Sequence, residues 1–309
     1  MKLSFVIPCY RSQNTVMKVV DEIETTVKQR PEYDYEIILV NDGSPDKVWD
    51  VICERAKADD KIIGINLSKN FGQHSALMAG YNNVSGDVIV SLDDDGQTPA
   101  CDVFKLVDEL NKGYDVVYAQ YSEVHQNWFR RLGSAFAKKI TDYLFDIKGD
   151  NRKGSSYYVV RRYIIDEMIR YKNPYPFLSG LVLRSTRNIS VVDIEHRNRI
   201  EGRSGYSIRK LIDLWLNGFT SFSIKPLKIG TYFGFFLACL GFVYAFITVI
   251  RKLFINPLME AGWSSIISVI LIIGGANLIM LGLLGEYTGR IFICINNSPQ
   301  YVIKEIVNK

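Results

Sequence analysis

Histidine and cysteine are scarce in this chain, and neither is arranged as a metal-binding or nucleophilic site. The three histidines lie far apart in the sequence: His74, His125 and His196. The cysteines are scattered without a CxxC pair, which argues against structural zinc and indicates a reducing compartment: Cys9, Cys53, Cys101, Cys239 and Cys294. Internal repeats and low-complexity tracts are also absent. A mechanism based on histidine or cysteine is therefore disfavoured, and we interpret His74 as a residue at the start of a helix.

Charge is absent from two long stretches in the last third of the chain, Ile229–Ile250 and Ala261–Gly285. At roughly 1.5 Å per residue, each is long enough as a helix to cross a hydrocarbon core of about 30 Å. We predict a membrane hairpin, against the alternative of a helix pair buried in a soluble core. The whole chain is 48% hydrophobic and 23% charged with a net charge of +4, yet residues 1–210 have the composition of a soluble protein. A purely soluble enzyme is therefore excluded.

The charges that flank these stretches predict their orientation. The connection between them, Arg251–Glu260, is short, whereas basic residues gather on the outer flanks at Arg203, Arg209, Lys210, Lys225, Lys228 and Arg290. Because basic residues favour the cytoplasmic side, we expect both ends of the hairpin and the large N-terminal domain to be cytoplasmic. Met1–Tyr10 resembles a buried strand and not a signal peptide. The mild basicity requires no nucleic-acid partner.

Residues 1–119 alternate between short apolar runs and helix-like segments. The predicted strands are Leu3–Ile7, Glu36–Val40, Ile62–Leu67, Asp87–Leu92 and Asp115–Ala119. The predicted helices are Ser12–Lys28, a helix that ends near Ala58, Gly72–Asn82 and Pro99–Asn111. This order predicts an α/β fold with a mostly parallel sheet, helices on both faces and ligands at the carboxyl ends of the strands.

The pattern divides the chain into five segments. Residues 207–228 interleave apolar and charged side chains, and we expect them either to lie in the membrane interface or to pack on the soluble domain. The full division is a soluble domain at 1–206, this amphipathic segment at 207–228, transmembrane helices at 229–250 and 261–285, and a cytoplasmic tail at 286–309.

Three consecutive aspartates, Asp93, Asp94 and Asp95, directly follow the predicted strand that ends at Leu92. Alternate residues at a strand end point to the same side, so we expect Asp93 and Asp95 to form a pair. Their mutual repulsion needs a cation or hydrogen-bond donors. Oxygen ligands without a nearby histidine favour Mg²⁺ or Mn²⁺, held together with substrate phosphates. The alternative is an acidic surface turn that caps the helix starting near Pro99.

Two other predicted strands end in residues suited to a nucleotide diphosphate. Pro8-Cys9-Tyr10 follows the first strand, and Asn41-Asp42-Gly43-Ser44 follows the second. Asp42 could accept a hydrogen bond from a base N–H, and Tyr10 could pack on the base or ribose. An Asp-Gly-Ser sequence alone is commonly just a turn, but the three strand ends together indicate a nucleotide site along one edge of the sheet.

Four segments in this order carry a resemblance to a known family: Val6–Tyr10, Val40–Ser44, Asn70–Gly80 and Asp93–Gln97. The chain resembles the family-2 glycosyltransferases with a GT-A fold, and within them it is most similar to the polyprenyl-phosphate glycosyltransferases. The similarity continues through Arg199–Ser207 to Gly285–Arg290, so it covers nearly the whole chain. It implies that residues 1–206 are a GT-A nucleotide-diphospho-sugar transferase domain followed by a two-helix transmembrane hairpin.

The resemblance implies a role for each matching residue. Asp42 corresponds to the base-recognising aspartate, and Asp93 and Asp95 correspond to the carboxylates that hold metal and diphosphate. Gln97 corresponds to the glutamine near the sugar, and Arg199 to the arginine of a segment that closes over the phosphates. The implied nucleotide-sugar contacts are Pro8, Tyr10, Asp42, Ser44, Asp94 and Arg203. The implied acceptor-phosphate contacts are Arg130, Arg131 and Ser155, although Arg130 and Arg131 could instead form a solvated basic face.

The chain departs from the family pattern at three places. Arg11-Ser12 stands where the family has Asn-Glu, Gly205 replaces a lysine, and Tyr158 occupies the position of an arginine. These changes leave open which side chains neutralise the two phosphates. The candidate replacements are Arg152, Lys153 and Arg203.

The implied activity is inverting transfer of a hexose from a nucleotide sugar, UDP-glucose or a related UDP-sugar, to undecaprenyl phosphate. The implied location is the bacterial inner membrane, with a multi-pass anchor and a cytoplasmic catalytic domain. Two alternatives remain. A processive polysaccharide synthase would need a Glu-Asp pair and a Gln-x-x-Arg-Trp segment, which this chain lacks. A non-catalytic membrane scaffold would not need Asp42, Asp93 and Asp95, whose presence argues against it. Homo-oligomerisation through Gly274, Gly275 and Gly282 is left open.

Overall fold

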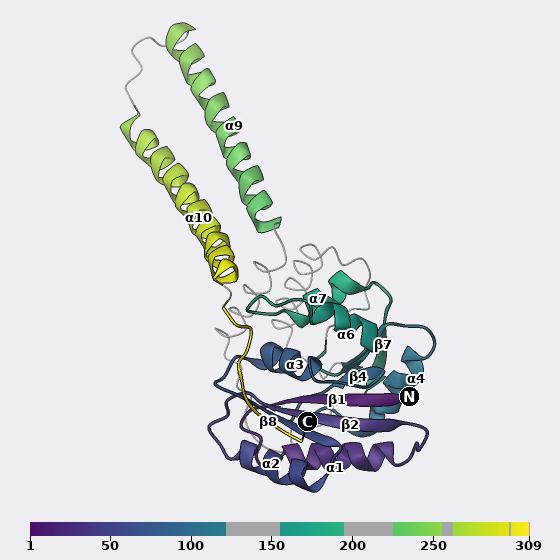
Figure 1. The fold of residues 1–309 in the computed structure, drawn as a ribbon. Helices are drawn as coiled ribbons and strands as arrows, with labels where there is room; N and C mark the ends of the chain where they lie inside the picture. Colours follow the sequence, from purple (N-terminus) through teal and green to yellow (C-terminus); the bar gives the residue numbers. More distant parts are fainter. Residues whose placement is uncertain (122–154, 195–224, 255–261, 297, 309) are drawn as a thin grey trace.

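The structure, a computed structural model, describes residues 1–121, 155–194, 225–254, 262–296 and 298–308. Figure 1 shows an α/β domain from which two long helices extend side by side. The domain is built on one eight-stranded sheet with the order β7-β5-β6-β4-β1-β2-β3-β8. This architecture agrees with the α/β fold and mostly parallel sheet predicted from the sequence.

The centre of the sheet is parallel, as predicted. Its strands are β1 (Lys2–Cys9), β2 (Asp34–Asn41), β3 (Ile62–Leu67) and β4 (Val88–Ser91). The helices between them are α1 (Val16–Val27), α2 (Val48–Ala58) and α3 (Gln73–Tyr81), and a short 3₁₀ turn (Ala100–Asp102) and α4 (Val103–Leu110) follow β4. Buried parallel strands are nearly continuous apolar runs, which is why their positions could be predicted from the sequence.

The second half of the domain adds both parallel and antiparallel strands. The elements are β5 (Val116–Tyr121), β6 (Tyr158–Arg161), α6 (Arg162–Met168), α7 (Leu178–Ser185) and β7 (Ile189–Ile194). Strand β6 inserts between β4 and β5 and runs antiparallel to both. Tyr158, the first residue of β6, therefore pairs with Ser91, the last residue of β4. This reversal brings the residues before β6 to the carboxyl end of β4.

Two hydrophobic clusters cover the two faces of the sheet. Helices α1, α2 and α4 bury their apolar side chains against one face, and α3, α6 and α7 bury theirs against the other. Helix α3 lies especially close to β1, because a side chain at Gly80 would place its Cβ 2.3 Å from Val6 Cγ1. The two-sided burial matches the prediction of helices on both faces.

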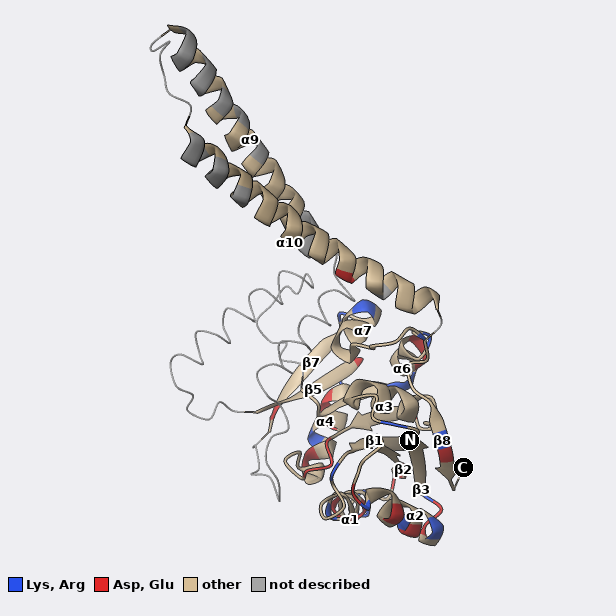
Figure 2. Ribbon diagram, turned by 90° about the vertical axis from the view of Figure 1, so that its left-hand side faces the viewer, with Lys and Arg blue, Asp and Glu red and all other residues tan. Residues whose placement is uncertain are grey.

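The two long helices are α9 (Lys225–Phe254) and α10 (Trp263–Ile295). Helix α9 extends past both ends of the predicted span 229–250, whereas α10 begins inside the predicted span 261–285 and continues past its end. They contact each other at Gly230, whose added Cβ would lie 2.1 Å from Met280 Sδ. Among the described residues, one stretch, Ile272–Ile295, is long and apolar enough to cross a membrane, and Gly230–Gly241 is a shorter apolar helix segment. Figure 2 shows how few charged residues α10 carries compared with the α/β domain.

The chain returns to the sheet after α10. Strand β8 (Ile303–Val307) pairs antiparallel with β3 and forms the edge of the sheet. The Gln300 side chain donates hydrogen bonds to the carbonyl oxygens of Asn173 (2.9 Å) and Tyr171 (3.3 Å). Asn308 donates to two carbonyl oxygens in the segment that leads into β3. Part of the segment predicted as a tail, 286–309, is thus the last turns of α10 and an edge strand of the domain.

Candidate functional site

The candidate site lies where β4, β1 and β2 end. The three strands are adjacent and parallel, so Asp93, Tyr10 and Asp42, which follow them, come to one edge of the sheet. Backbone bonds join these ends, since the amide of Leu92 donates to Val6 and the amide of Asp42 donates to Cys9. The structure thereby brings together the three strand ends that the sequence singled out.

Asp94 ties the acidic turn to the end of β1. Its Oδ2 accepts a hydrogen bond from the backbone amide of Tyr10 at 2.9 Å. Burial raises the pKa of Asp94 to about 6, against the lowering effect of the Ser12 hydroxyl and the Tyr10 amide. The negative charges of Asp93 and Asp95 raise this pKa further. In the structure Asp94 thus orders the loop after β1, and its predicted contact with the nucleotide sugar stays a prediction.

Asp93 receives a hydrogen bond on each carboxylate oxygen. The Gln73 side-chain amide, from the first turn of α3, donates to Oδ1 at 2.8 Å. The Ser156 hydroxyl, from the segment before β6, donates to Oδ2 at 2.5 Å. Ser156 can reach Asp93 because β6 runs antiparallel to β4. Two elements distant in sequence therefore hold this carboxylate.

Asp95 and Gln97 form a tight turn after the strand. The backbone amide of Gln97 donates to Asp95 Oδ1 at 3.0 Å, which is the two-residue pattern of an Asx turn. Gly96 lies between them with a φ of 73°. The turn keeps the Asp95 carboxylate beside the end of β4, close in sequence to Asp93.

Asp42 is buried beneath the loop that leads into α3. Its carboxylate accepts hydrogen bonds from the backbone amides of Phe71 (2.7 Å) and Gly72 (2.9 Å), while the Asn70 side chain donates to its carbonyl oxygen. Burial raises the pKa of Asp42, and the two amides partly offset that effect. Gly43 is required beside it, since its φ is 57° and an added Cβ would lie 2.4 Å from the Lys69 carbonyl carbon.

The other predicted nucleotide contacts near these strands have different environments. Tyr10 is 43% exposed and Arg11 lies over its ring, 5.5 Å from the centroid. The Ser44 hydroxyl donates to Asp46 at 2.6 Å and accepts from the Arg11 amide at 2.8 Å. Pro8 is a buried residue of β1 paired with Val40. Tyr10 is thus open to a ligand, while Ser44 mainly orders the loop.

The start of β6 contains Tyr158, which stands where the family pattern has an arginine. The Ser155 hydroxyl accepts a hydrogen bond from the amide of Tyr157 at 3.2 Å. Tyr158, which replaces an arginine, is buried in the core, where its hydroxyl contacts the Tyr81 hydroxyl and its ring lies 5.2 Å from that of Tyr118. Tyr158 therefore fills the core on the α3 side of the sheet.

Several predicted site residues lie outside the described residues. These are Arg130, Arg131, Arg199 and Arg203, together with the candidate replacements Arg152 and Lys153. Their roles stay predictions that follow from the resemblance.

Sequence reasoning did not assign Gln73 or Ser156 to the site. Gln73 belongs to the Asn70–Gly80 segment that resembles the family, and this could have pointed to it as a site residue. No sequence pattern pointed to Ser156. His74, predicted at a helix start, is the second residue of α3, and its Nδ1 lies 3.1 Å from the carbonyl oxygen of Pro176. Because a carbonyl oxygen can only accept, Nδ1 carries the proton. Burial lowers the pKa of His74, which favours the neutral ring.

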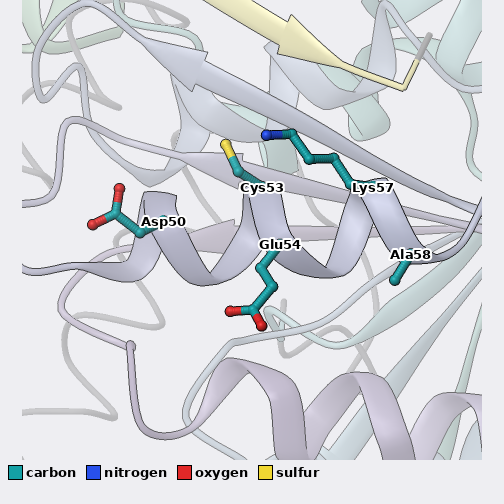
Figure 3. A pocket seen from close by; sticks show the side chains of 5 residues that line it. All are labelled: Asp50, Cys53, Glu54, Lys57 and Ala58. Carbon is teal, nitrogen blue, oxygen red and sulfur yellow. The ribbon is translucent and has the colours of Figure 1, made fainter.

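A surface pocket elsewhere in the domain has no part in this site. Figure 3 shows its lining residues, all on helix α2: Asp50, Cys53, Glu54, Lys57 and Ala58. Its volume is about 510 Å³. Burial and the nearby charge of Glu305, on β8, raise the pKa of Cys53. None of the predicted site residues lines this pocket.

Family models match both parts of the chain. The model of glycosyl transferase family 2 matches residues 4–173, and the model of the GtrB C-terminal hairpin matches residues 225–291. The second match covers α9 and most of α10. Membrane association of the chain is therefore indicated by a known hairpin type.

Curated relatives are similar over almost the entire chain. The uncharacterized glycosyltransferase YkcC of Bacillus subtilis (strain 168) is 32% identical over 315 residues, which cover 99% of this chain and 94% of that protein. Undecaprenyl-phosphate 4-deoxy-4-formamido-L-arabinose transferase of Proteus mirabilis (strain HI4320) is 33% identical over 309 residues, with the same coverage.

Solved structures share the fold at lower identity. Glucosyl-3-phosphoglycerate synthase from Mycobacterium tuberculosis, in complex with phosphoglyceric acid, matches with a TM-score of 0.53 and 20% identity over 70% of this chain and 76% of that one. Mannosyl-3-phosphoglycerate synthase from Rubrobacter xylanophilus matches with a TM-score of 0.51 and 15% identity over 71% of each chain. Because the first family model covers more than half of the residues and the curated relatives exceed 30% identity at nearly full length, the chain belongs to glycosyl transferase family 2.

Proposed function

We propose that this chain transfers a hexose from a nucleotide sugar to a polyprenyl phosphate, with inversion at the anomeric carbon, at the cytoplasmic face of the bacterial plasma membrane. The acceptor class is supported by the Proteus mirabilis relative, which is an undecaprenyl-phosphate sugar transferase by name. A lipid acceptor also accounts for the hairpin, because a long polyprenyl chain stays in the bilayer. The donor class that we propose is a UDP-hexose, UDP-glucose or a related sugar.

The observation that carries the proposal is the convergence of Asp42, Tyr10 and Asp93 at the ends of three adjacent strands. A nucleotide sugar is an extended ligand with a base at one end and a diphosphate near the other. Asp42 is proposed to accept from a base N–H, since each of its oxygens keeps a lone pair beyond the bond from a backbone amide. The exposed ring of Tyr10 is proposed to pack on the base or ribose.

Asp93 and Asp95 suit a divalent cation that also binds the diphosphate. Within the described residues there is no group of three or more His, Cys, Asp or Glu side chains suited to hold a metal ion. A site with two carboxylates must take its remaining ligands from phosphates and water, which is how proteins commonly hold Mg²⁺ and Mn²⁺. Bound there, a cation would offset the charge that develops on the departing nucleoside diphosphate.

The acceptor needs no strong base from the protein. The second pKa of a phosphate monoester lies near 6, so at pH 7 the lipid phosphate is already mostly a dianion and can act as the nucleophile. The work left to the protein is to hold donor and acceptor in line. Arg130, Arg131 and Arg199 are proposed to bind the phosphates, and the hairpin is proposed to hold the acceptor's polyprenyl chain.

The proposal is tested with purified full-length protein, undecaprenyl phosphate and a panel of radiolabelled nucleotide sugars. We expect label from one donor to enter the lipid phase, and EDTA to stop the transfer. Asp95→Ala should abolish transfer while the protein stays folded and membrane-bound. Full-rate glycolipid synthesis after removal of all divalent ions would refute the metal assignment, and failure with every donor would refute the acceptor assignment.

The same assay separates the enzyme from a non-catalytic scaffold. A glycosyltransferase that lacks its acceptor is expected to hydrolyse its donor slowly, and this hydrolysis should depend on the metal ion. A scaffold would release no sugar in either condition.

A further inference from the structure

The carboxylate of Asp93 is held by two neutral donors from separate parts of the fold. Gln73 is the first residue of α3, and Ser156 lies two residues before β6. They lie 20 and 63 residues from Asp93 in the sequence, and each bonds a different oxygen of the same carboxylate. Such an arrangement forms only when α3 and β6 both dock at the end of β4.

These two bonds restrict a torsion that is otherwise soft. Rotation of an aspartate carboxylate about its Cβ–Cγ bond is broad and roughly two-fold, so one hydrogen bond leaves the plane of the group poorly defined. Donors on both oxygens fix that plane. An amide and a hydroxyl are neutral donors, so they do not cancel the negative charge that would attract a cation.

The loop that carries Gln73 also contacts Asp42. The backbone amides of Phe71 and Gly72 donate to the Asp42 carboxylate, and the next residue, Gln73, donates to Asp93. The His74 ring then bonds the Pro176 carbonyl oxygen and lies tilted against the ring of Phe177, with 6.0 Å between the ring centroids. Residues 71–74 therefore link the ends of β2 and β4, and His74 anchors that link to the segment before α7.

We propose that Gln73 and Ser156 are positioning residues that fix the plane of the Asp93 carboxylate, and that the link 71–74 sets its placement relative to Asp42. The inference rests on the proposed function, because it assigns these residues to donor binding and transfer. It goes beyond the roles implied by the family resemblance, which include neither side chain. Gln73 and Ser156 act through Asp93 and need not touch the substrate.

The test compares Gln73→Ala and Ser156→Ala with wild-type protein in full-length form. Loss of an outer hydrogen bond to a metal-binding carboxylate typically costs about 10- to 100-fold in metal affinity or activity, and we expect that range for kcat and for Mn²⁺ affinity in the presence of UDP. UDP affinity in metal-free buffer should change by less than about threefold, because the Asp42 bonds come from backbone amides that both variants retain. A merely structural role would alter both affinities together.

Two further variants separate positioning from folding. Ser156→Thr retains the hydroxyl and should recover most of the activity that Ser156→Ala loses. Gln73→Glu has nearly the same shape but sets a carboxylate against Asp93, so its loss should be at least as large as that of Gln73→Ala. Gln29→Ala, at an exposed glutamine of the same domain, is the matched control and should behave as wild type.

The double variant Gln73→Ala/Ser156→Ala gives the sharpest outcome. If both residues act through one carboxylate, the double variant should lose less kcat than the product of the two single losses. Single variants with wild-type kcat and wild-type Mn²⁺ affinity would overturn the inference and leave the proposed function intact. If wild-type protein transfers no sugar, the proposed function fails, but calorimetry of Mn²⁺ and UDP binding to the variants still tests the positioning roles. If wild-type protein binds neither Mn²⁺ nor UDP, the proposed function and the positioning roles are both overturned.

Discussion

Removal of the C-terminal strand should destabilise the α/β domain itself. The change is a deletion of residues 298–308, which leaves α10 and the hairpin intact. The deletion removes the hydrogen bonds of Gln300 to Asn173 and Tyr171, those of Asn308 to Asp59 and Ile62, and the bond from the Ser68 amide to Val302. It also leaves one edge of β3 without a partner strand.

The size of the effect follows from these contacts. A hydrogen bond of this kind contributes about 0.5 to 1.5 kcal/mol net, so the five named bonds together are worth about 2.5 to 7.5 kcal/mol. The apolar contacts of Tyr301, Ile303 and Ile306 with the core add to that sum. For a domain of this size, about 3 kcal/mol corresponds to a melting temperature lower by about 6 °C or more.

The assay combines thermal unfolding in detergent with hydrogen exchange of the β3 amides. The deletion should lower the melting temperature and speed exchange over Ile62–Leu67. Asn308→Ala, which removes two of the bonds, should show a smaller shift in the same direction, and Lys304→Ala, at an exposed residue of β8, should show none. Unchanged exchange at β3 in the deleted protein would refute the reasoning, because β8 would then not pair with that edge.

Three further predictions concern single residues. Glu36 is buried and its pKa is lowered, because bonds from Lys2, Ser4 and Ser85 outweigh the raising effect of burial; its stabilisation is present above its ordinary pKa of about 4.5 and lost as the pH falls below it. Glu36→Gln should therefore flatten the acid limb of a urea-unfolding series, and an unchanged limb would contradict this. Gly80→Val should cost about 1 to 3 kcal/mol by overpacking, measured by urea unfolding; equal stability would disprove the close approach. Asp42→Asn should weaken UDP binding in calorimetry, since its amide nitrogen would face a backbone donor, and unchanged affinity would count against the base-binding role.

The first half of the fold was predictable because its strands are local features of the sequence. Ile62–Leu67 was predicted with the observed bounds, since the segment is a mostly apolar and mostly buried run. The edge strand β8 was not, because Ile303–Val307 contains exposed Lys304 and Glu305 and reads as a polar tail. Its pairing with β3 is a contact between residues more than two hundred positions apart, which no local pattern encodes.

The site was predictable to the extent that its residues follow strands. Asp93 comes directly after an apolar run and Asp42 comes one residue after a second such run, and parallel strand ends share one edge of a sheet. Gln73 and Ser156 could not be placed in this way. Gln73 begins a helix, and Ser156 reaches Asp93 only because β6 is antiparallel to its neighbours, a reversal that depends on sheet order and not on the residues of β6.

Two buried carboxylates, one near the start of strand β2 and one just after its end, have pKa values shifted in opposite directions. Glu36, near its amino end, bonds Lys2 at 2.8 Å and has a lowered pKa, so its charge stabilises the fold. Asp42, just beyond its carboxyl end, has a pKa raised by burial, and so does Asp94, beyond the carboxyl end of β4. The Glu36 carboxylate is paired with a cation inside the protein, whereas burial makes the charged forms of Asp42 and Asp94 costly, and such raised pKa values are typical of positions that bind a ligand. A cation or a base N–H at that edge would lower these pKa values again, which is why the carboxyl edge, and not the opposite one, is the place to expect the chemistry.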